Sequence, residues 1–171
     1  MNILIRCPNW IGDQVLAFPF FHFLRKAYPQ ARITAACVPW VKDIQFSDYV
    51  DDVFVIETNR DASLFQRFKL LETSAKNLKQ RSQKEFDLAF SLPNSFSSAL
   101  FLNRTGAQTR VGYGTEGRGF LLNRKISWKE SESKHRADSY LRLLEEDLQK
   151  AGLKRPSAFD FWGQPSRPEY N

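Results

Sequence analysis

Residues 2–13 of the chain read Asn-Ile-Leu-Ile-Arg-Cys-Pro-Asn-Trp-Ile-Gly-Asp, and this stretch decides the fold. Its three consecutive aliphatic residues, ended by Pro8, predict a short buried strand over 2–6. The residues after Pro8 predict a loop, and the apolar spacing beyond it predicts a helix over 12–28. Pro19 lies inside that helix, so we expect it to kink the helix or to delay its regular part.

The same alternation of strands and helices continues along the chain. Further strands are predicted at 33–38, 53–56, 87–91 and 109–111. Helices are predicted at 41–46, 62–81, 95–102 and 134–150, and a glycine-rich loop at 112–119. Because the strands are apolar on both faces, we expect an α/β fold, a parallel sheet covered by helices on each side. Residues 1–155 form one domain in this interpretation, and 156–171 form a linker or frayed tail.

The composition is that of a packed domain with a basic surplus. The 171 residues carry a formal net charge of +6, and 42% of them are hydrophobic. The surplus favours anionic partners such as phosphate, nucleic acid or an acidic membrane face, and it is equally compatible with solubility alone. Cys7 and Cys37 belong to apolar runs that are typical of strands, and they are expected as buried free thiols, which indicates a cytosolic protein. No apolar stretch reaches the ~18 residues of a membrane span.

Three predicted loops leave the carboxyl ends of strands, where ligands bind in open α/β sheets. The first loop lacks both the GxGxxG fingerprint of dinucleotide sites and the P-loop motif. Its Gly12 allows a ligand to approach the backbone closely. Asp13 has two interpretations, an N-cap carboxylate for the following helix or a general base that faces a cleft.

The other two loops also carry polar side chains. Asn94 and Ser95 open a predicted helix, where they either cap it or leave its amides to hold a hydroxyl or a phosphate. Arg118 is the cation of the glycine-rich loop and suits bidentate binding of phosphate. The alternative for Arg118 is a solvated arginine on an exposed, mobile loop. The sequence contains no Asp-x-Asp motif, so we predict no divalent metal site for a sugar diphosphate.

Three motifs in order resemble a known enzyme family. They are ILIRCPNWIGDQV at 3–15 with RKAYPQARI at 25–33, LPNSFSSAL at 92–100, and RVGYGTEGRGFLLN at 110–123. Together they resemble the ADP-heptose:lipopolysaccharide heptosyltransferases of glycosyltransferase family 9, and among these the type II members. The resemblance runs from Met1 to about Leu148.

The resemblance implies a GT-B fold, in which two Rossmann-like domains face a cleft. The N-terminal domain takes the lipid-linked inner-core acceptor, and the C-terminal domain takes ADP-heptose. Transfer inverts the anomeric carbon without a metal. The donor domain is absent from the 171 residues, so we expect a truncated protein, a cloned domain or a split product. We expect it to be inactive alone, because catalysis needs both substrates held in one geometry.

The resemblance also implies roles for individual residues. Asp13 falls at the position of the family's proposed base. Arg118, and more loosely Arg60, fall where contacts to acceptor phosphate are expected. Neighbouring residues of the first two loops complete the expected acceptor site, namely Asn9, Trp10, Gly12, Asn94 and Ser95.

The expected partners are the lipid-linked, phosphorylated inner-core acceptor and ADP-heptose, with no cofactor, no metal and no nucleic acid. A cytoplasmic location follows, with peripheral contact at the cytoplasmic face of the inner membrane as one option. Two alternatives stay open. One is another GT-B enzyme, such as a sugar-nucleotide epimerase, and the other is a non-catalytic basic α/β binding module.

Overall fold

The sheet consists of six parallel strands, and the first strand lies in its interior. The computed structural model describes residues 1–59, 61–115, 117–128 and 135–162. The strands are β1 (Asn2–Arg6), β2 (Arg32–Cys37), β3 (Asp52–Val55), β4 (Leu88–Ser91), β5 (Thr109–Tyr113) and β6 (Arg124–Ile126). Their order is β3-β2-β1-β4-β5-β6, and every neighbouring pair is parallel. This is the strand order of Rossmann-type sheets, so the predicted α/β architecture is confirmed.

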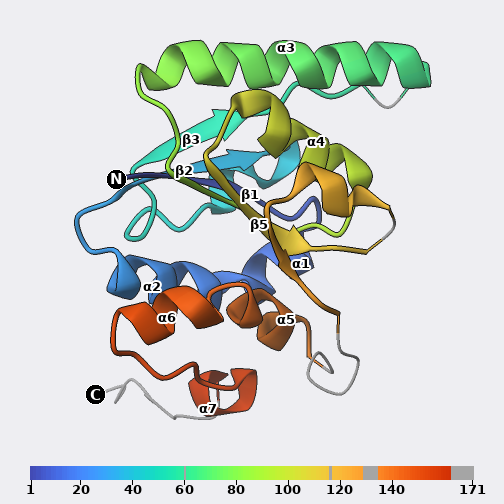
Figure 1. The fold of residues 1–171 in the computed structure, drawn as a ribbon. Helices are drawn as coiled ribbons and strands as arrows, with labels where there is room; N and C mark the ends of the chain where they lie inside the picture. The colour runs from blue at the N-terminus through green and yellow to red at the C-terminus, as the bar shows by residue number, and fades with distance from the viewer. Residues whose placement is uncertain (60, 116, 129–134, 163–171) are drawn as a thin grey trace, which may run out of the picture.

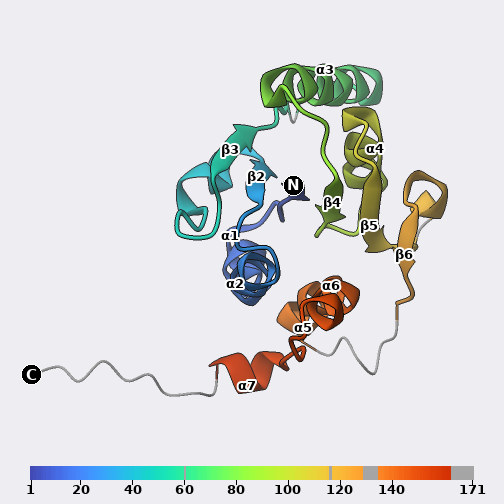
Figure 2. The same ribbon diagram turned by 60° about the vertical axis from the view of Figure 1, so that its left-hand side comes forward.

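Helices cover both faces of the sheet. The α-helices are α1 (Ile11–Leu16), α2 (Phe18–Ala27), α3 (Leu64–Ser82), α4 (Phe96–Thr105), α5 (Arg136–Arg142), α6 (Glu145–Lys150) and α7 (Ala158–Trp162). Two 3₁₀ helices, η1 (Pro39–Ile44) and η2 (Arg118–Leu121), lie between them. Figures 1 and 2 show α3 and α4 on one face of the sheet, and α1, α2, α5 and α6 on the other.

Successive side chains of β1 enter two different hydrophobic clusters, one on each face of the sheet. Ile3 and Ile5 are fully buried in the cluster that includes Phe20 of α2. Leu4, between them, is buried in the cluster on the opposite face with Phe101 of α4. This alternation follows from the two-residue repeat of a strand. Each fully buried aromatic or aliphatic side chain of this kind stabilises the fold by about 1.5–3 kcal/mol.

Two of the predicted long helices are each divided in the structure. The helix expected at 12–28 is divided because α1 ends at Leu16 and α2 begins at Phe18. Pro19 lies in the first turn of α2, where backbone N–H groups have no partner within the helix, so a proline is tolerated there. The expectation that Pro19 delays the regular part of the helix is confirmed. The helix expected at 134–150 is divided between Arg142 and Glu145.

The C-terminal part of the described chain differs most from the prediction. The strand β6 was not expected, because its three residues contain only one aliphatic side chain. The prediction of an irregular tail from 156 is wrong for residues 158–162, which form α7. The amide of Ala158 donates to Asp138 Oδ1 over 2.6 Å, and this bond joins α7 to α5. Residues 163–171 lie outside the described part of the chain.

Candidate functional site

The loop after β1 is held in place by contacts from two strand ends. Arg6, the last residue of β1, is only 7% exposed and donates from Nη2 to Asn9 Oδ1 over 2.6 Å. Trp40, which follows β2, donates from Nε1 to the backbone oxygen of Asn9 over 2.6 Å. Burial lowers the pKa of Arg6. An arginine begins so high that it stays charged near neutral pH, so the loop carries a fixed positive charge at its base.

Asp13 lies in the first turn of α1, just beyond this loop. Trp10 is the N-cap residue of α1, and no side chain caps the helix, so the interpretation of Asp13 as an N-cap carboxylate is wrong. The Asp13 side chain is 32% exposed, and its Oδ1 lies 3.7 Å from Arg136 Nε on α5. Burial, and next the charge of Asp13, raise the pKa of Tyr140 on the same helix. Asp13 is therefore an accessible carboxylate beside one cation and one neutral phenol.

The surface around Asp13 is open. A Cβ placed on Gly12 would have no atom within 4 Å, and its φ lies outside the left-handed region. The backbone therefore does not require a glycine here, and what Gly12 provides is space. Trp10 is 70% exposed beside it. A ligand has room to approach the start of α1 along this surface.

Arg118 is a buried residue that joins two loops. Its Nη1 donates to the backbone oxygens of Pro93 and Ser95 over 2.8 and 3.2 Å, and its Nη2 donates to Asn94 Oδ1 over 2.7 Å. The side chain has no exposed surface. The interpretation of Arg118 as a solvated arginine on an exposed loop is therefore wrong, and its bonds inside the protein compete with the predicted contact to phosphate. The physical reason is a left-handed turn at Gly117, with φ of 70°, after which η2 packs on α4.

The neighbouring polar residues have structural partners as well. Ser95 is the N-cap of α4, and its side chain accepts from the Ser98 amide over 3.3 Å. The capping interpretation of Ser95 is confirmed. Asn94 offers its side-chain oxygen to Arg118, so the expected acceptor contact of this oxygen has a competitor inside the protein.

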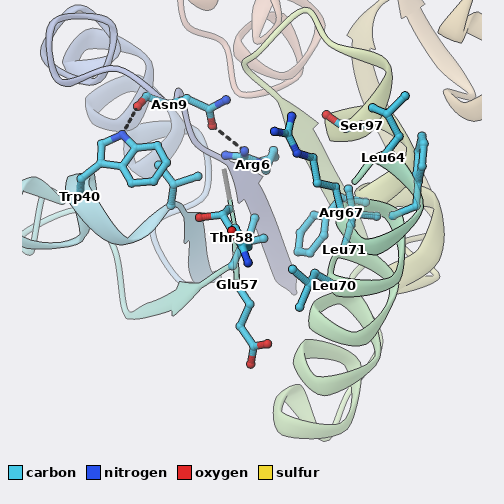
Figure 3. Close-up of a pocket in the computed structure, with 15 residues that line it drawn as sticks. Arg6, Asn9, Trp40, Glu57, Thr58, Leu64, Arg67, Leu70, Leu71 and Ser97 are labelled. Carbon is cyan, nitrogen blue, oxygen red and sulfur yellow. Dashed lines mark hydrogen bonds between the residues drawn. The ribbon is translucent and has the colours of Figure 1, made fainter. Parts of the chain in front are cut away.

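A cavity of about 370 Å³ opens near the carboxyl ends of β1, β2 and β3 (Figure 3). Arg6 and Asn9 form part of its polar side. Leu64 and Leu71 of α3 contribute to the opposite wall. Figure 3 shows the guanidinium of Arg67 extending from α3 toward Arg6 and Asn9. Two cationic side chains therefore line a cavity with one apolar wall, which suits a ligand that has both anionic and apolar parts.

The structure brings only some of the expected site residues together. Asn9, Trp10, Gly12 and Asp13 share one loop and helix start, but of these only Asn9 lines the cavity. Arg60 lies outside the described residues. Arg6, Trp40 and Arg67, which follow or face the ends of the first three strands, were not predicted as site residues. Ligands bind at the carboxyl ends of strands in open α/β sheets. The same rule, applied to the segments after the second and third strands, would have indicated this part of the site.

Comparison with known proteins places the chain in a family. The model of glycosyltransferase family 9 (heptosyltransferase) matches residues 75–163, which is more than half of the chain. The chain belongs to glycosyltransferase family 9. The resemblance found in the sequence is thereby confirmed.

Members of family 9 with similar sequences include lipopolysaccharide heptosyltransferase 2 of Escherichia coli K12. It is 30% identical over 124 residues, which cover 72% of this chain and 34% of the relative. The solved structure of E. coli ADP-heptose lipopolysaccharide heptosyltransferase II is 27% identical, with a TM-score of 0.63 over 77% of this chain and 36% of that chain. The chain thus spans about a third of the length of the relatives it matches.

A second family structure supports the fold alone. E. coli heptosyltransferase WaaC with ADP-2-deoxy-2-fluoro heptose has a TM-score of 0.69 at 16% identity, over 92% of this chain and 50% of that chain. The shared architecture is the Rossmann-like sheet, as expected for the N-terminal domain of a GT-B fold. In the described ranges, no three His, Cys, Asp or Glu side chains gather where a metal ion would be held.

Proposed function

We propose that this chain is the acceptor-side domain of an inverting glycosyltransferase, which transfers heptose from ADP-heptose to the inner core of lipopolysaccharide. Membership of family 9 supports the reaction class, and the heptosyltransferase names of the relatives support the substrates. Because the chain spans about a third of those relatives, turnover in this proposal requires a donor-binding domain in addition to residues 1–171.

The observation that carries the proposal is the accessible carboxylate of Asp13 beside the space left by Gly12. In the proposed reaction an acceptor hydroxyl attacks the anomeric carbon of the donor, and Asp13 takes the hydroxyl proton. The bond between the anomeric carbon and the phosphate oxygen breaks, and ADP leaves with the bonding electrons. Arg136 Nε lies 3.7 Å from Asp13 Oδ1, so a positive charge stands beside the carboxylate in this proposal.

The cavity supplies the proposed subsite for an anionic part of the acceptor. Arg6 is fixed by its bond to Asn9, and Arg67 faces it from α3 (Figure 3). An arginine held in place loses little conformational freedom when it binds a phosphate. Arg6 and Arg67 take over, in this proposal, the phosphate-binding role that the sequence had suggested for Arg118.

The proposal includes no cofactor and no metal ion, since a carboxylate base and fixed cations supply the required chemistry. It also includes a cytoplasmic location with peripheral contact to the inner membrane, where a lipid-linked acceptor is found. Of the helices in the described ranges, none combines the length and the apolar composition that crossing a bilayer requires.

The test is an NMR titration of the isotope-labelled chain with a soluble, deacylated and phosphorylated inner-core oligosaccharide. We expect saturable shifts at the amides of Asn9 and Gly12 and at Trp40 Nε1, and weaker binding of the dephosphorylated sugar. Arg67→Gln should remove most of the preference for phosphate, whereas Lys76→Gln, an exposed change farther along α3, should retain it. Shifts confined to other surfaces, or no saturable shift, would contradict the proposal.

A further inference from the structure

The N-terminal third of α3 stands away from the body of the protein. Residues 64–69 are all exposed, and the first fully buried residues of the helix are Ser74 and Ala75. Figure 1 shows this end of α3 extending past α4 and the sheet. The exposed residues include large apolar ones, with Leu64 74%, Phe65 77% and Phe68 41% exposed. The core does not account for Leu64 and Phe65, because each leaves most of its surface exposed, and Phe68 continues this apolar surface with a smaller exposed part.

The start of α3 is nevertheless well defined. Ser63 and Gln66 form a capping box, in which each side chain bonds the backbone amide of the other residue. This arrangement stabilises the first turn of the helix through local bonds. The apolar side chains are therefore presented on a formed helix, with a preset geometry for a partner.

The charge of α3 indicates what kind of partner this is. The helix carries five basic residues and a single acidic one, Glu72, whose carboxylate pairs with Arg104 over 2.9 Å. Arg67 and Lys69 lie among the exposed apolar residues. Leu and Phe side chains beside Lys and Arg are typical of helices that lie in the interface of an anionic bilayer, with the apolar groups below the headgroups.

We propose that Leu64, Phe65 and Phe68 form a membrane-docking tip, which inserts into the interface of an anionic bilayer while Lys69 contacts lipid phosphates. A nucleic acid would also attract the basic helix. It would leave Leu64 without a partner, since a leucine offers neither a stacking surface nor a hydrogen bond to a base. The apolar content of the tip favours the bilayer.

The tip is continuous with the cavity. Leu64 and Phe68 line the cavity that also contains Arg6 and Asn9. When the tip is inserted, the apolar wall of the cavity therefore faces the bilayer, and a lipid-linked acceptor reaches the cations without leaving the membrane completely. This path for the acceptor rests on the proposed function, and the docking tip locates on α3 the peripheral membrane contact that the proposed function includes.

The test is co-sedimentation of the chain with vesicles of phosphatidylcholine, with or without phosphatidylglycerol, that contain no acceptor. We expect binding to the anionic vesicles. The double variant Phe65→Ser/Phe68→Ser should lower it by about tenfold or more, the order expected from the loss of two apolar side chains. Lys69→Glu should lower it by about tenfold, since it replaces an attractive charge with a repulsive one. Phe120→Ser, at a side chain that is 73% exposed on η2, is the matched control and should leave binding unchanged.

Two outcomes would overturn the docking tip. One is vesicle binding that the Phe65→Ser/Phe68→Ser variant retains in full. The other is binding of a single-stranded RNA, without vesicles, that the same substitutions weaken equally. The oligosaccharide titration contains no bilayer, so a failure of the docking tip and a failure of the proposed function are measured separately.

Discussion

The guanidinium of Arg118 donates to the side-chain oxygen of Asn94 over 2.7 Å, and this bond joins the loop after β4 to the turn after β5. Two further bonds to backbone oxygens at Pro93 and Ser95 complete the arrangement. A motif residue that the sequence suggested as a phosphate ligand therefore acts inside the protein. Its side chain fixes the position of the loop after β4 relative to the turn after β5. These two segments form part of the surface at the carboxyl end of the sheet.

Arg118→Ala should destabilise the protein. The substitution leaves three acceptors without their charged donor, so we expect the free energy of unfolding to fall by about 3 kcal/mol. Urea denaturation measures this loss. Arg104→Ala removes an exposed arginine from a surface ion pair and should cost at most about 1 kcal/mol. If Arg118→Ala unfolded at the wild-type urea concentration, Arg118 would not be the residue that holds the two loops together.

Asp13→Asn should separate catalysis from folding. Because Asp13 is not the N-cap of α1, only its dipole and ion-pair interactions are lost, and we expect a change of about 1 kcal/mol or less in stability. In a chain that carries a donor-binding domain, turnover should fall by about 10²–10⁴. Asp48→Asn, at an exposed carboxylate elsewhere, should have neither effect. Normal turnover by the Asp13→Asn enzyme would end the assignment of the base.

Gly12→Ala tests whether the space beside Asp13 is used. The new methyl group meets no protein atom within 4 Å, and alanine is the better helix former by about 1 kcal/mol. The variant should therefore melt at or above the wild-type temperature. Binding of the soluble acceptor should nevertheless weaken, because the methyl group occupies the space that the sugar approaches. Unchanged affinity, measured by calorimetry, would show that the acceptor lies elsewhere.

His22 should make stability depend on pH. Burial lowers the pKa of His22, and the charge of Lys26 lowers it further. The unfolded chain therefore binds a proton at His22 more tightly than the folded protein does. The contribution of neutral His22 to the free energy of unfolding is complete above the unfolded pKa of about 6.5. It is lost as the pH falls through the lower, folded value. Urea midpoints measured across this range should drop toward acid less steeply in His22→Gln than in the wild type.

The sequence predicted the order of the main elements well because their signals are local. The aliphatic run at 3–5 and the 3–4 spacing of apolar residues in α3 each depend on a few neighbouring residues. The breaks between helices and the strand β6 depend on tertiary packing and were missed, except for the one that Pro19 causes. The site was predicted less completely. Asn9 and Asp13 were selected from their position after β1, whereas the burial of Arg118 depends on a loop that lies 23 to 25 residues away in the sequence.

The interior position of β1 also sets how the molecule opens. Its backbone is paired with β2 on one side and with β4 on the other, so its amide protons should exchange with solvent only when the whole sheet unfolds. The first turns of α3, which have little packing, should exchange through local fraying. Asp13 is thus attached to the slowest-exchanging part of the protein, and the bilayer-facing residues to one of the fastest. In a deuterium-exchange time course, the amides of β1, next to the loop that leads to Asp13, should stay protected. The amides of the first turns of α3, which carry the proposed lipid contact, should exchange much earlier.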